Sequence, residues 1–187
     1  MCAMVREISA GGVVLREIEG VWHVALIEPQ KEDSRESNPS SDDSQPAKVP
    51  RKRTRAVLCL PKGLVDAGEK AEAAAIREVF EETGIVAEAV TKLVDIKYVY
   101  VRSWGDGQRV FKIVSFYLMK YLSGDIGDIA PEMKIEVARA LWTPLVDANK
   151  KMAYSGERKV VLQAREYFAE HGLAAKQNLS KRQKSSS

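Results

Sequence analysis

The feature that most constrains this chain is a glutamate-rich segment bounded by glycines, GLVDAGEKAEAAAIREVFEETGI, at residues 63–85. Alanine, glutamate and arginine favour helices, so the segment predicts a helix from about Ala71 to Thr83. Gly84 follows in the position where glycine commonly ends a helix. The fold must therefore accommodate a short and highly charged helix in the middle of the chain.

The expected helix has two unlike faces at about 100° per residue. The apolar face carries Ile76, Phe80 and Thr83, with Val79 at its edge. The opposite face carries Glu78, Glu81 and Glu82. Like charges at this spacing weaken a helix by roughly a few tenths of a kcal/mol, and Arg77 can relieve only part of that repulsion. A hard cation such as Mg²⁺ would relieve more, although a glutamate-rich face can also be a plain solvated surface.

The spacing of the whole segment resembles the Nudix box. Its fixed positions are Gly63, Glu69, Arg77, Glu78, Val79, Glu81, Glu82, Gly84 and Ile85. The gaps between the groups are five, seven, one and one residues. So many constrained positions at fixed spacing are far more specific than a lone glycine motif. We therefore identify the chain as similar to the Nudix hydrolases over about residues 4–172.

This resemblance implies an α/β fold, the α/β/α sandwich of the family, with a mixed β-sheet and a loop-helix-loop at the box. It also implies Mg²⁺-dependent hydrolysis, with Mn²⁺ as a substitute, of a phosphoanhydride bond by water. The chemistry agrees, because attack on repelling phosphate oxygens requires cations that neutralise charge and a positioned nucleophile.

The resemblance also implies roles for the residues of the box. Metal ligands would be Glu78 and Glu82, then Glu81, and in some members the carbonyl of Gly63. Glu69 and Arg77 would hold this cluster in place, although an ordinary structural ion pair explains Arg77 equally well.

The residue that activates water is left open by the resemblance. Family members take this base from the box helix, here Glu78 or Glu81, or from a later loop. On the later loop, Glu136 lies six residues before Trp142 and resembles the extra glutamate of polyphosphate-cleaving members. Glu132 is the alternative on the same loop, and both also fit ordinary surface glutamates.

The residues before and after the box bear on the substrate. LPKG at residues 60–63 resembles the box entrance of members that cleave dinucleoside polyphosphates, and of members that clean oxidised nucleoside triphosphates. Lys62 and Arg55 are candidate phosphate contacts, and Tyr100 lies where the first group carries a tyrosine, although a tyrosine there also fits a packed strand. The ADP-ribose group has a proline near Tyr100, which this chain lacks.

We therefore expect a nucleoside polyphosphate substrate. Two alternatives stay open: a pyrophosphohydrolase acting on RNA 5′ ends, and a Nudix-fold sensor that binds a nucleotide without cleaving it.

Elsewhere the pattern predicts strands around this helix. Two β-rich stretches, ISAGGVVLREI and VWHVALIEP, flank Glu19-Gly20. AVLCLP predicts a short strand ahead of the box, and KLVDIKYVYVRSW with RVFKIVSFYLMKYLSG predicts a hairpin. A further strand is expected at ALWTPL, and a helix at GERKVVLQAREYFAEHG, where Val160, Val161, Ala164 and Phe168 recur at helical spacing. This order predicts a mixed sheet between helices.

Two polar segments are expected to lie outside that domain. Residues 31–54 hold almost no large apolar side chain, which predicts a disordered surface insertion, and residues 173–187 read as a basic disordered tail. Much of the excess of basic over acidic residues lies in two clusters, at residues 51–55 and 176–184. No aromatic residues are interleaved with them. Nucleic acid is therefore not the expected partner.

Composition agrees with one compact domain. The chain has 187 residues, 45% of them hydrophobic, and a formal net charge of +3. Cys2 and Cys59 lack metal-type or redox spacing and are expected to be reduced. No signal peptide or membrane span is expected, which predicts a cytoplasmic protein. Its oligomeric state is left open.

Overall fold

The structure is a computed structural model that describes residues 5–30, 57–101 and 108–173. Several predictions concern other parts of the chain: the insertion at 31–54, the tail after residue 173, the state of Cys2, and the role of Arg55. These lie outside the described residues and stay predictions.

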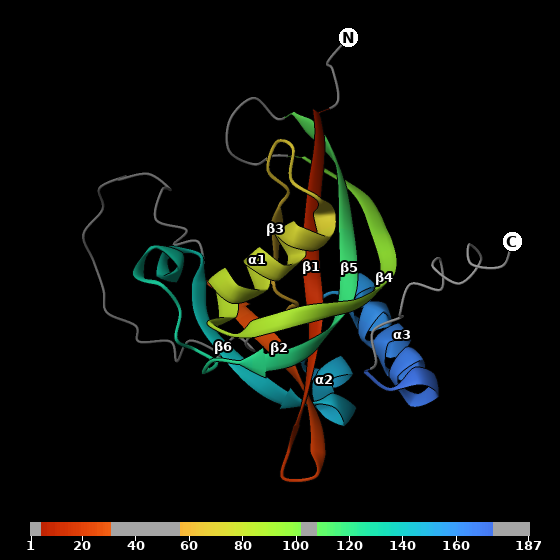
Figure 1. Ribbon diagram of the computed structural model, residues 1–187. Helices are drawn as coiled ribbons and strands as arrows, with labels where there is room; N and C mark the ends of the chain where they lie inside the picture. The colour runs from red at the N-terminus through yellow and green to blue at the C-terminus, as the bar shows by residue number, and fades with distance from the viewer. Residues whose placement is uncertain (1–4, 31–56, 102–107, 174–187) are drawn as a thin grey trace, which may run out of the picture.

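A mixed sheet forms the centre of the molecule (Figure 1). Its strands are β1 (Val5–Ile18), β2 (Val21–Pro29), β3 (Lys62–Leu64), β4 (Val86–Val101), β5 (Arg109–Ser123) and β6 (Val137–Pro144). They lie in the order β4-β5-β1-β2-β6, and β3 pairs with β1. β1 and β5 run parallel, whereas the other neighbours are antiparallel. β1 is therefore the central strand, with β5 along one edge and β2 and β3 along the other.

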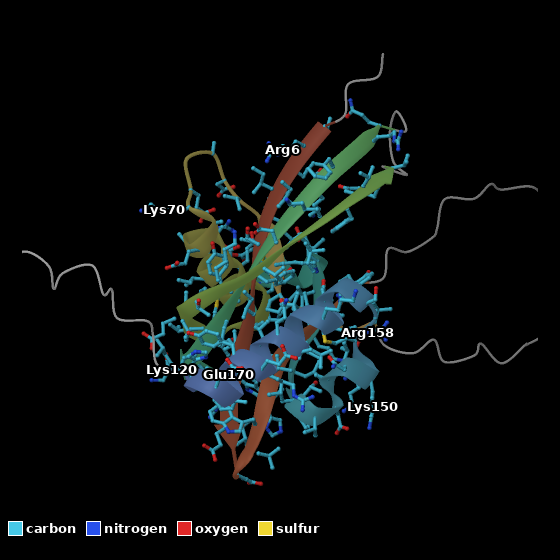
Figure 2. All side chains as sticks on the ribbon, turned by 90° about the vertical axis from the view of Figure 1, so that its right-hand side faces the viewer. Arg6, Lys70, Lys120, Lys150, Arg158 and Glu170 are labelled. Carbon is cyan, nitrogen blue, oxygen red and sulfur yellow. The ribbon has the colours of Figure 1, made fainter. Side chains whose placement is uncertain are left out.

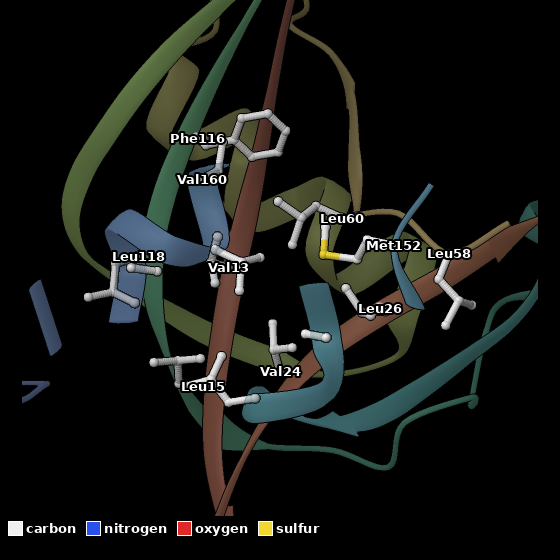
Figure 3. Packing of buried hydrophobic residues seen from close by; sticks show 14 of the residues in the cluster. Val13, Leu15, Val24, Leu26, Leu58, Leu60, Phe116, Leu118, Met152 and Val160 are labelled. Atoms are coloured by element: carbon white, nitrogen blue, oxygen red, sulfur yellow. The ribbon is translucent and has the colours of Figure 1, made fainter. Parts of the chain in front are cut away.

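The two faces of this sheet are covered by different helices. α1 (Ala71–Thr83) packs on the face that includes Ala10 and Val14, while α2 (Leu145–Lys151) and α3 (Ser155–His171) pack on the face with Val13 and Leu15. Successive residues of a strand point to opposite faces, so the apolar run of β1 serves both layers. Figure 3 shows the larger cluster, which lies on the α3 side. The predicted α/β/α sandwich is confirmed.

The end of α1 is fastened to a distant loop. Gly84 has φ of 77°, and its N–H donates to the carbonyl of Phe80 at 2.8 Å, as in a common glycine C-cap. The carbonyl of Asp128 lies where a Cβ on Gly84 would project, and the N–H of Gly127 donates to the carbonyl of Thr83 at 2.9 Å. The loop that precedes the 3₁₀ helix η1 (Pro131–Ile135) therefore starts against the box helix.

The segment AVLCLP does not form the predicted strand. Within its described part, Leu58 and Cys59 make single bridges to Met152 and Ile27, and regular pairing starts only at Lys62. The apolar pattern instead reflects burial, because Leu58, Cys59 and Leu60 are each at most 4% exposed. Burial also raises the pKa of Cys59 to about 11, which keeps the thiol protonated.

Other elements follow the predicted pattern more closely. The β1–β2 and β4–β5 pairs are antiparallel as expected, and the C-terminal helix is α3, whose Val160, Val161 and Ala164 are buried. Figure 2 shows α3 in front of the sheet, with charged side chains along it. The sequence pattern did not reveal α2, which has only seven residues, or η1, which has five, because such lengths show no clear period. Among the described residues, no helix is long and apolar enough to span a membrane.

Candidate functional site

The predicted division of α1 into an apolar and a carboxylate face is wrong at three positions. Glu78 and Glu82 are each 7% exposed, whereas Phe80 is 53% exposed. Val79 and Thr83 are buried as predicted, and Ala74 and Ala75 pack with Val79 on the sheet. The small alanines let α1 lie close to the sheet. With the alanines facing the sheet, Glu78 and Glu82 face β3.

Two backbone features of β3 receive these carboxylates. The carboxylate of Glu78 lies against Gly63, where a Cβ on any other residue would overlap it. The N–H of Lys62 donates to Oε2 of Glu82 at 2.7 Å. Pairing of Gly63 with Ala10 fixes β3 on the central strand. The entrance of the box and its helix therefore meet at two adjacent residues.

Arg77 links the remaining acidic residues of the box. Its guanidinium makes two hydrogen bonds to Glu69, of 3.1 and 2.9 Å, and further bonds of 2.8 Å to Glu78 and 3.0 Å to Glu81. It also donates to the carbonyl of Leu64 at 2.9 Å. The bonds to Glu69 are the main cause that raises the pKa of Arg77, and the same bonds lower the pKa of Glu69. Arg77 is thus a charged hub between the box loop and α1.

Burial sets the charge state of the inner carboxylates. It raises the pKa of Glu82 from 4.5 to about 8, against the opposing hydrogen bond from Lys62 N–H. Burial also raises the pKa of Glu78, and the hydrogen bond from Arg77 offsets part of this effect. Two carboxylates with raised pKa values in one site are typical of a functional centre. They are costly unless a cation or a proton accompanies them.

Glu136 lies within electrostatic range of this pair. Its negative charge contributes to the raised pKa values of both Glu78 and Glu82. Its carbonyl accepts the N–H of Gln30 at 2.7 Å, and the Gln30 side chain donates to the carbonyl of Lys134 at 2.9 Å. Gln30, at the end of β2, thereby holds the segment after η1 beside the box. Glu132, the alternative, lies exposed in η1.

A cavity of about 650 Å³ opens on the other side of Lys62. Its lining includes four aromatic side chains, Tyr98, Tyr100, Phe116 and Tyr154, together with Lys62, Lys112 and Glu157. The Tyr100 hydroxyl donates to Glu7 at 2.9 Å, and Lys112 Nζ lies 3.8 Å from the same carboxylate. Burial lowers the pKa of Lys112, with an opposing effect of Glu7. The aromatic cavity thus adjoins the box at Lys62, whose N–H contacts Glu82.

These features can be compared with known proteins. The model of the NUDIX domain matches residues 44–179, well over half of the chain. The chain belongs to the Nudix hydrolase family. It is 37% identical over 159 residues to MutT4 of Mycobacterium tuberculosis (strain CDC 1551 / Oshkosh), a match that covers 83% of this chain. The chain spans about half, 53%, of that relative's length.

Solved structures agree with the Nudix fold. An Ap4A hydrolase of C. elegans, in a binary complex, superposes with a TM-score of 0.58 at 23% identity, covering 88% of this chain and 98% of that one. A MutT Nudix hydrolase of Burkholderia pseudomallei gives 0.55 at 21% identity, covering 84% and 97%. The Nudix domain of Shewanella oneidensis NrtR, complexed with ADP ribose, gives 0.54 at 19% identity, covering 89% of each chain. At these identities the likeness concerns the fold.

The Nudix box of this chain offers a donor set that suits Mg²⁺. Glu78 and Glu82 supply buried carboxylate oxygens beside the main chain of Gly63. Within the described ranges, no three Asp, Glu, His or Cys side chains converge as a ready-made cluster. Mg²⁺ does not require one, because it commonly binds to one or two carboxylates and completes its shell with water and substrate phosphates. The residues present therefore fit the ion.

Several residues of the site carry no signal in the sequence. Glu157, Gln30, Lys112 and Tyr154 lie on elements far from the box in the chain. A glutamate in the first turn of a helix, or a tyrosine before one, fits many structural roles equally well. The sequence signals came from the spacing inside the box and from the resemblance that singled out Lys62, Tyr100 and Glu136.

Proposed function

We propose that this Nudix protein hydrolyses a phosphoanhydride bond of a nucleoside polyphosphate in a Mg²⁺-dependent reaction. The observation that carries the proposal is the buried carboxylate pair Glu78 and Glu82, which meets the box entrance at Lys62, a residue that also lines the aromatic cavity. A solvated helix face would not bury two glutamates. A site that receives cations and phosphates accounts for both the burial and the raised pKa values.

Glu78 and Glu82 are the principal metal ligands in this proposal, with Glu81 and the Gly63 carbonyl as further ones. Glu81 lies at the rim, with its side chain 36% exposed and one oxygen 3.0 Å from Arg77. Mg²⁺, or Mn²⁺ in its place, would neutralise phosphate charge and stabilise the leaving phosphate. Arg77 and Glu69 support the ligands, because one guanidinium contacts both the loop and the helix.

Glu136 is our proposed general base. Its charge acts on both Glu78 and Glu82, so it lies near the place where a water would attack a phosphate bound there. Exposure at the end of η1 leaves its carboxylate accessible to water. Glu78 and Glu81 are alternatives within the helix, but each already accepts a hydrogen bond from Arg77.

The aromatic cavity is our proposed nucleoside site. Tyrosine and phenylalanine rings stack on any base, and Tyr100 is held in place by Glu7. Lys112 lines the cavity together with Lys62, the residue next to the box. We propose that Lys112 contacts the phosphate chain between nucleoside and metal.

The substrate class we propose is a dinucleoside polyphosphate or an oxidised nucleoside triphosphate. The MutT4 relative is named as a mutator protein, which favours the triphosphate. The C. elegans neighbour is an Ap4A hydrolase, which favours the dinucleoside polyphosphate. Both substrates place one nucleoside in the cavity and a chain of phosphates over the box.

A substrate panel tests the proposal. The purified chain is assayed with Mg²⁺ against dinucleoside polyphosphates, ordinary and oxidised nucleoside triphosphates, ADP-ribose and 5′-triphosphorylated RNA, and the products are identified. We expect metal-dependent turnover of one of the first two classes and its loss in Glu82→Gln. Binding without product would favour the sensor alternative, and turnover of RNA alone would favour the 5′-end alternative. Equal turnover by Glu82→Gln would reject the assigned site.

A further inference from the structure

We propose that Glu157 of α3 is a positioning residue for the metal site. It holds the ammonium group of Lys62 away from Glu82. The main-chain N–H of Lys62 can then orient the Glu82 carboxylate, while the Lys62 side chain forms no ion pair with it. The inference rests on the proposed role of Glu82 as a metal ligand. It assigns to a residue about 75 positions beyond the box an influence on the box itself.

Glu157 is a buried carboxylate whose two oxygens have separate partners. The residue is 5% exposed and lies in the first turn of α3. Oε1 is 3.1 Å from Nζ of Lys62, and Oε2 accepts the N–H of Leu60 at 2.8 Å. Buried charges are tolerated when they are paired and hydrogen-bonded in this way. Glu157 therefore anchors both the main chain and the side chain of the box entrance.

Lys62 stands between two buried carboxylates. Its N–H donates to Oε2 of Glu82 at 2.7 Å, while its ammonium group pairs with Glu157. On the side of the sheet, the carbonyl of Pro61 accepts the N–H of Gly12 at 3.1 Å, which fixes the same short segment to β1. The position of the main chain at Lys62 is thus determined by β1, by α3 and by the box helix together.

The consequence concerns competition for Glu82. Two opposite charges attract strongly where water is largely excluded, so an ammonium group released by Glu157 would turn to the other buried carboxylate beside it. An ion pair between Lys62 and Glu82 would occupy the oxygen that a metal needs. Glu157 prevents this by offering the ammonium group a better-placed partner.

Removing charge without removing shape tests the inference. Glu157→Gln keeps an oxygen that can accept the Leu60 N–H but loses the charge that holds Lys62. We expect this variant of the full chain to bind Mg²⁺ about tenfold more weakly in calorimetric titrations without nucleotide. Adding Lys62→Met should restore affinity to within about twofold of wild type, because the competing ammonium is gone while the Lys62-position N–H remains.

The rescue separates positioning from mere structural support. Glu28→Gln is the matched control, since Glu28 also pairs with a cation, Arg139 at 2.7 Å across β2 and β6, and this pair includes no box residue, so Mg²⁺ affinity should stay unchanged. Circular dichroism verifies that each variant is folded. A Glu157→Gln protein that binds like the control, or whose loss persists in the double variant, overturns the inference.

Two further comparisons keep the result decisive. If Glu157→Gln does not fold, Lys62→Met is compared with the double variant. We expect equal Mg²⁺ affinity, since Glu157 has no ammonium left to hold, and a tenfold weaker double variant overturns the inference. Glu82→Gln tests the underlying metal site: unchanged binding there rejects the proposed function, whereas lost binding there with intact binding in Glu157→Gln rejects only the role of Glu157.

Discussion

The two faces of the sheet bury different kinds of side chain. On the α3 face, branched and aromatic side chains such as Leu26, Phe116 and Leu118 are buried almost completely (Figure 3). On the α1 face, alanines bring the helix close, and Glu78 and Glu82 are buried beside them. The difference indicates that the apolar cluster of the first face mainly stabilises the fold, with the paired Glu157 buried at its margin, while the second face buries two carboxylates that burial disfavours as charged groups. Four predictions test this division.

The largest expected effect is on the α3 face. Leu118 is fully buried in the apolar cluster, so Leu118→Ala should lower the free energy of unfolding by about 2–5 kcal/mol through lost apolar contact and a cavity. Urea denaturation measures this loss. Mg²⁺ affinity of the folded fraction should stay at the wild-type value, and a parallel loss of affinity would contradict the division between the faces.

The next prediction concerns the α1 face, where we expect turnover to fall while stability does not. Glu82→Gln on the α1 face should reduce turnover by about 100-fold, or about 2.7 kcal/mol, because a proposed metal ligand is lost. Stability should not fall with it, since the amide keeps an acceptor for the Lys62 N–H and replaces a carboxyl group whose ionisation burial opposes. Steady-state kinetics and urea denaturation of the same sample provide the check. A protein that is both inactive and strongly destabilised would show that Glu82 is a structural residue.

A smaller effect is expected at the contact between the box loop and the helix. In Gly63→Ala the new Cβ would overlap the Glu78 carboxylate, which must move away from β3. We expect Mg²⁺ affinity to fall about tenfold, within the range found when the surroundings of a metal ligand are disturbed. Gly20→Ala is the control, because Gly20 lies in the β1–β2 turn with φ of 76°, so an alanine there strains the turn but its Cβ meets no neighbouring atom. Equal Mg²⁺ affinity in both variants would contradict the prediction.

A further effect is a dependence of stability on pH. The pKa of Glu82 is about 8 in the folded protein and near its ordinary 4.5 when unfolded. Between these values the folded state binds more protons, so the metal-free protein should become less stable as pH rises from about 5 to 8. The cation replaces the proton, so Mg²⁺ should raise the melting temperature more at about pH 8.5 than at about pH 5.5. Melting curves with Mg²⁺ or a chelator measure this, and a pH-independent Mg²⁺ effect would contradict it.

The same contrast explains which parts of the structure were predictable from sequence. The ends of α1 and the position of Gly84 were predictable because propensity and capping are local. The paired strands β1 and β2 also carry local alternation. The buried face of α1 was not predictable, because hydropathy assigns Glu82 to solvent and Phe80 to the core. The N–H of Lys62 donates a hydrogen bond to the buried Glu82, and no side-chain pattern can reveal such a main-chain donor.

The site shows the same limit. The spacing inside the box identified Glu78, Glu82 and Arg77, whose contacts lie within one loop and one helix. Glu157 and Gln30 could not be identified, because each reaches the site only through tertiary packing of a distant element. Composition also did not predict that Leu58 and Cys59 would be buried while forming only isolated β-bridges.

The contact between Gly84 and Asp128 has a consequence for protein engineering. Loop exchange between relatives is a natural route to new substrate selectivity, and here the loop of interest carries Glu136. Because that loop starts against the end of α1, a donor segment joined before Asp128 would shift the helix as well. Grafts that begin after Asp128 should leave the box undisturbed, so this carbonyl marks where the exchangeable part of the chain begins.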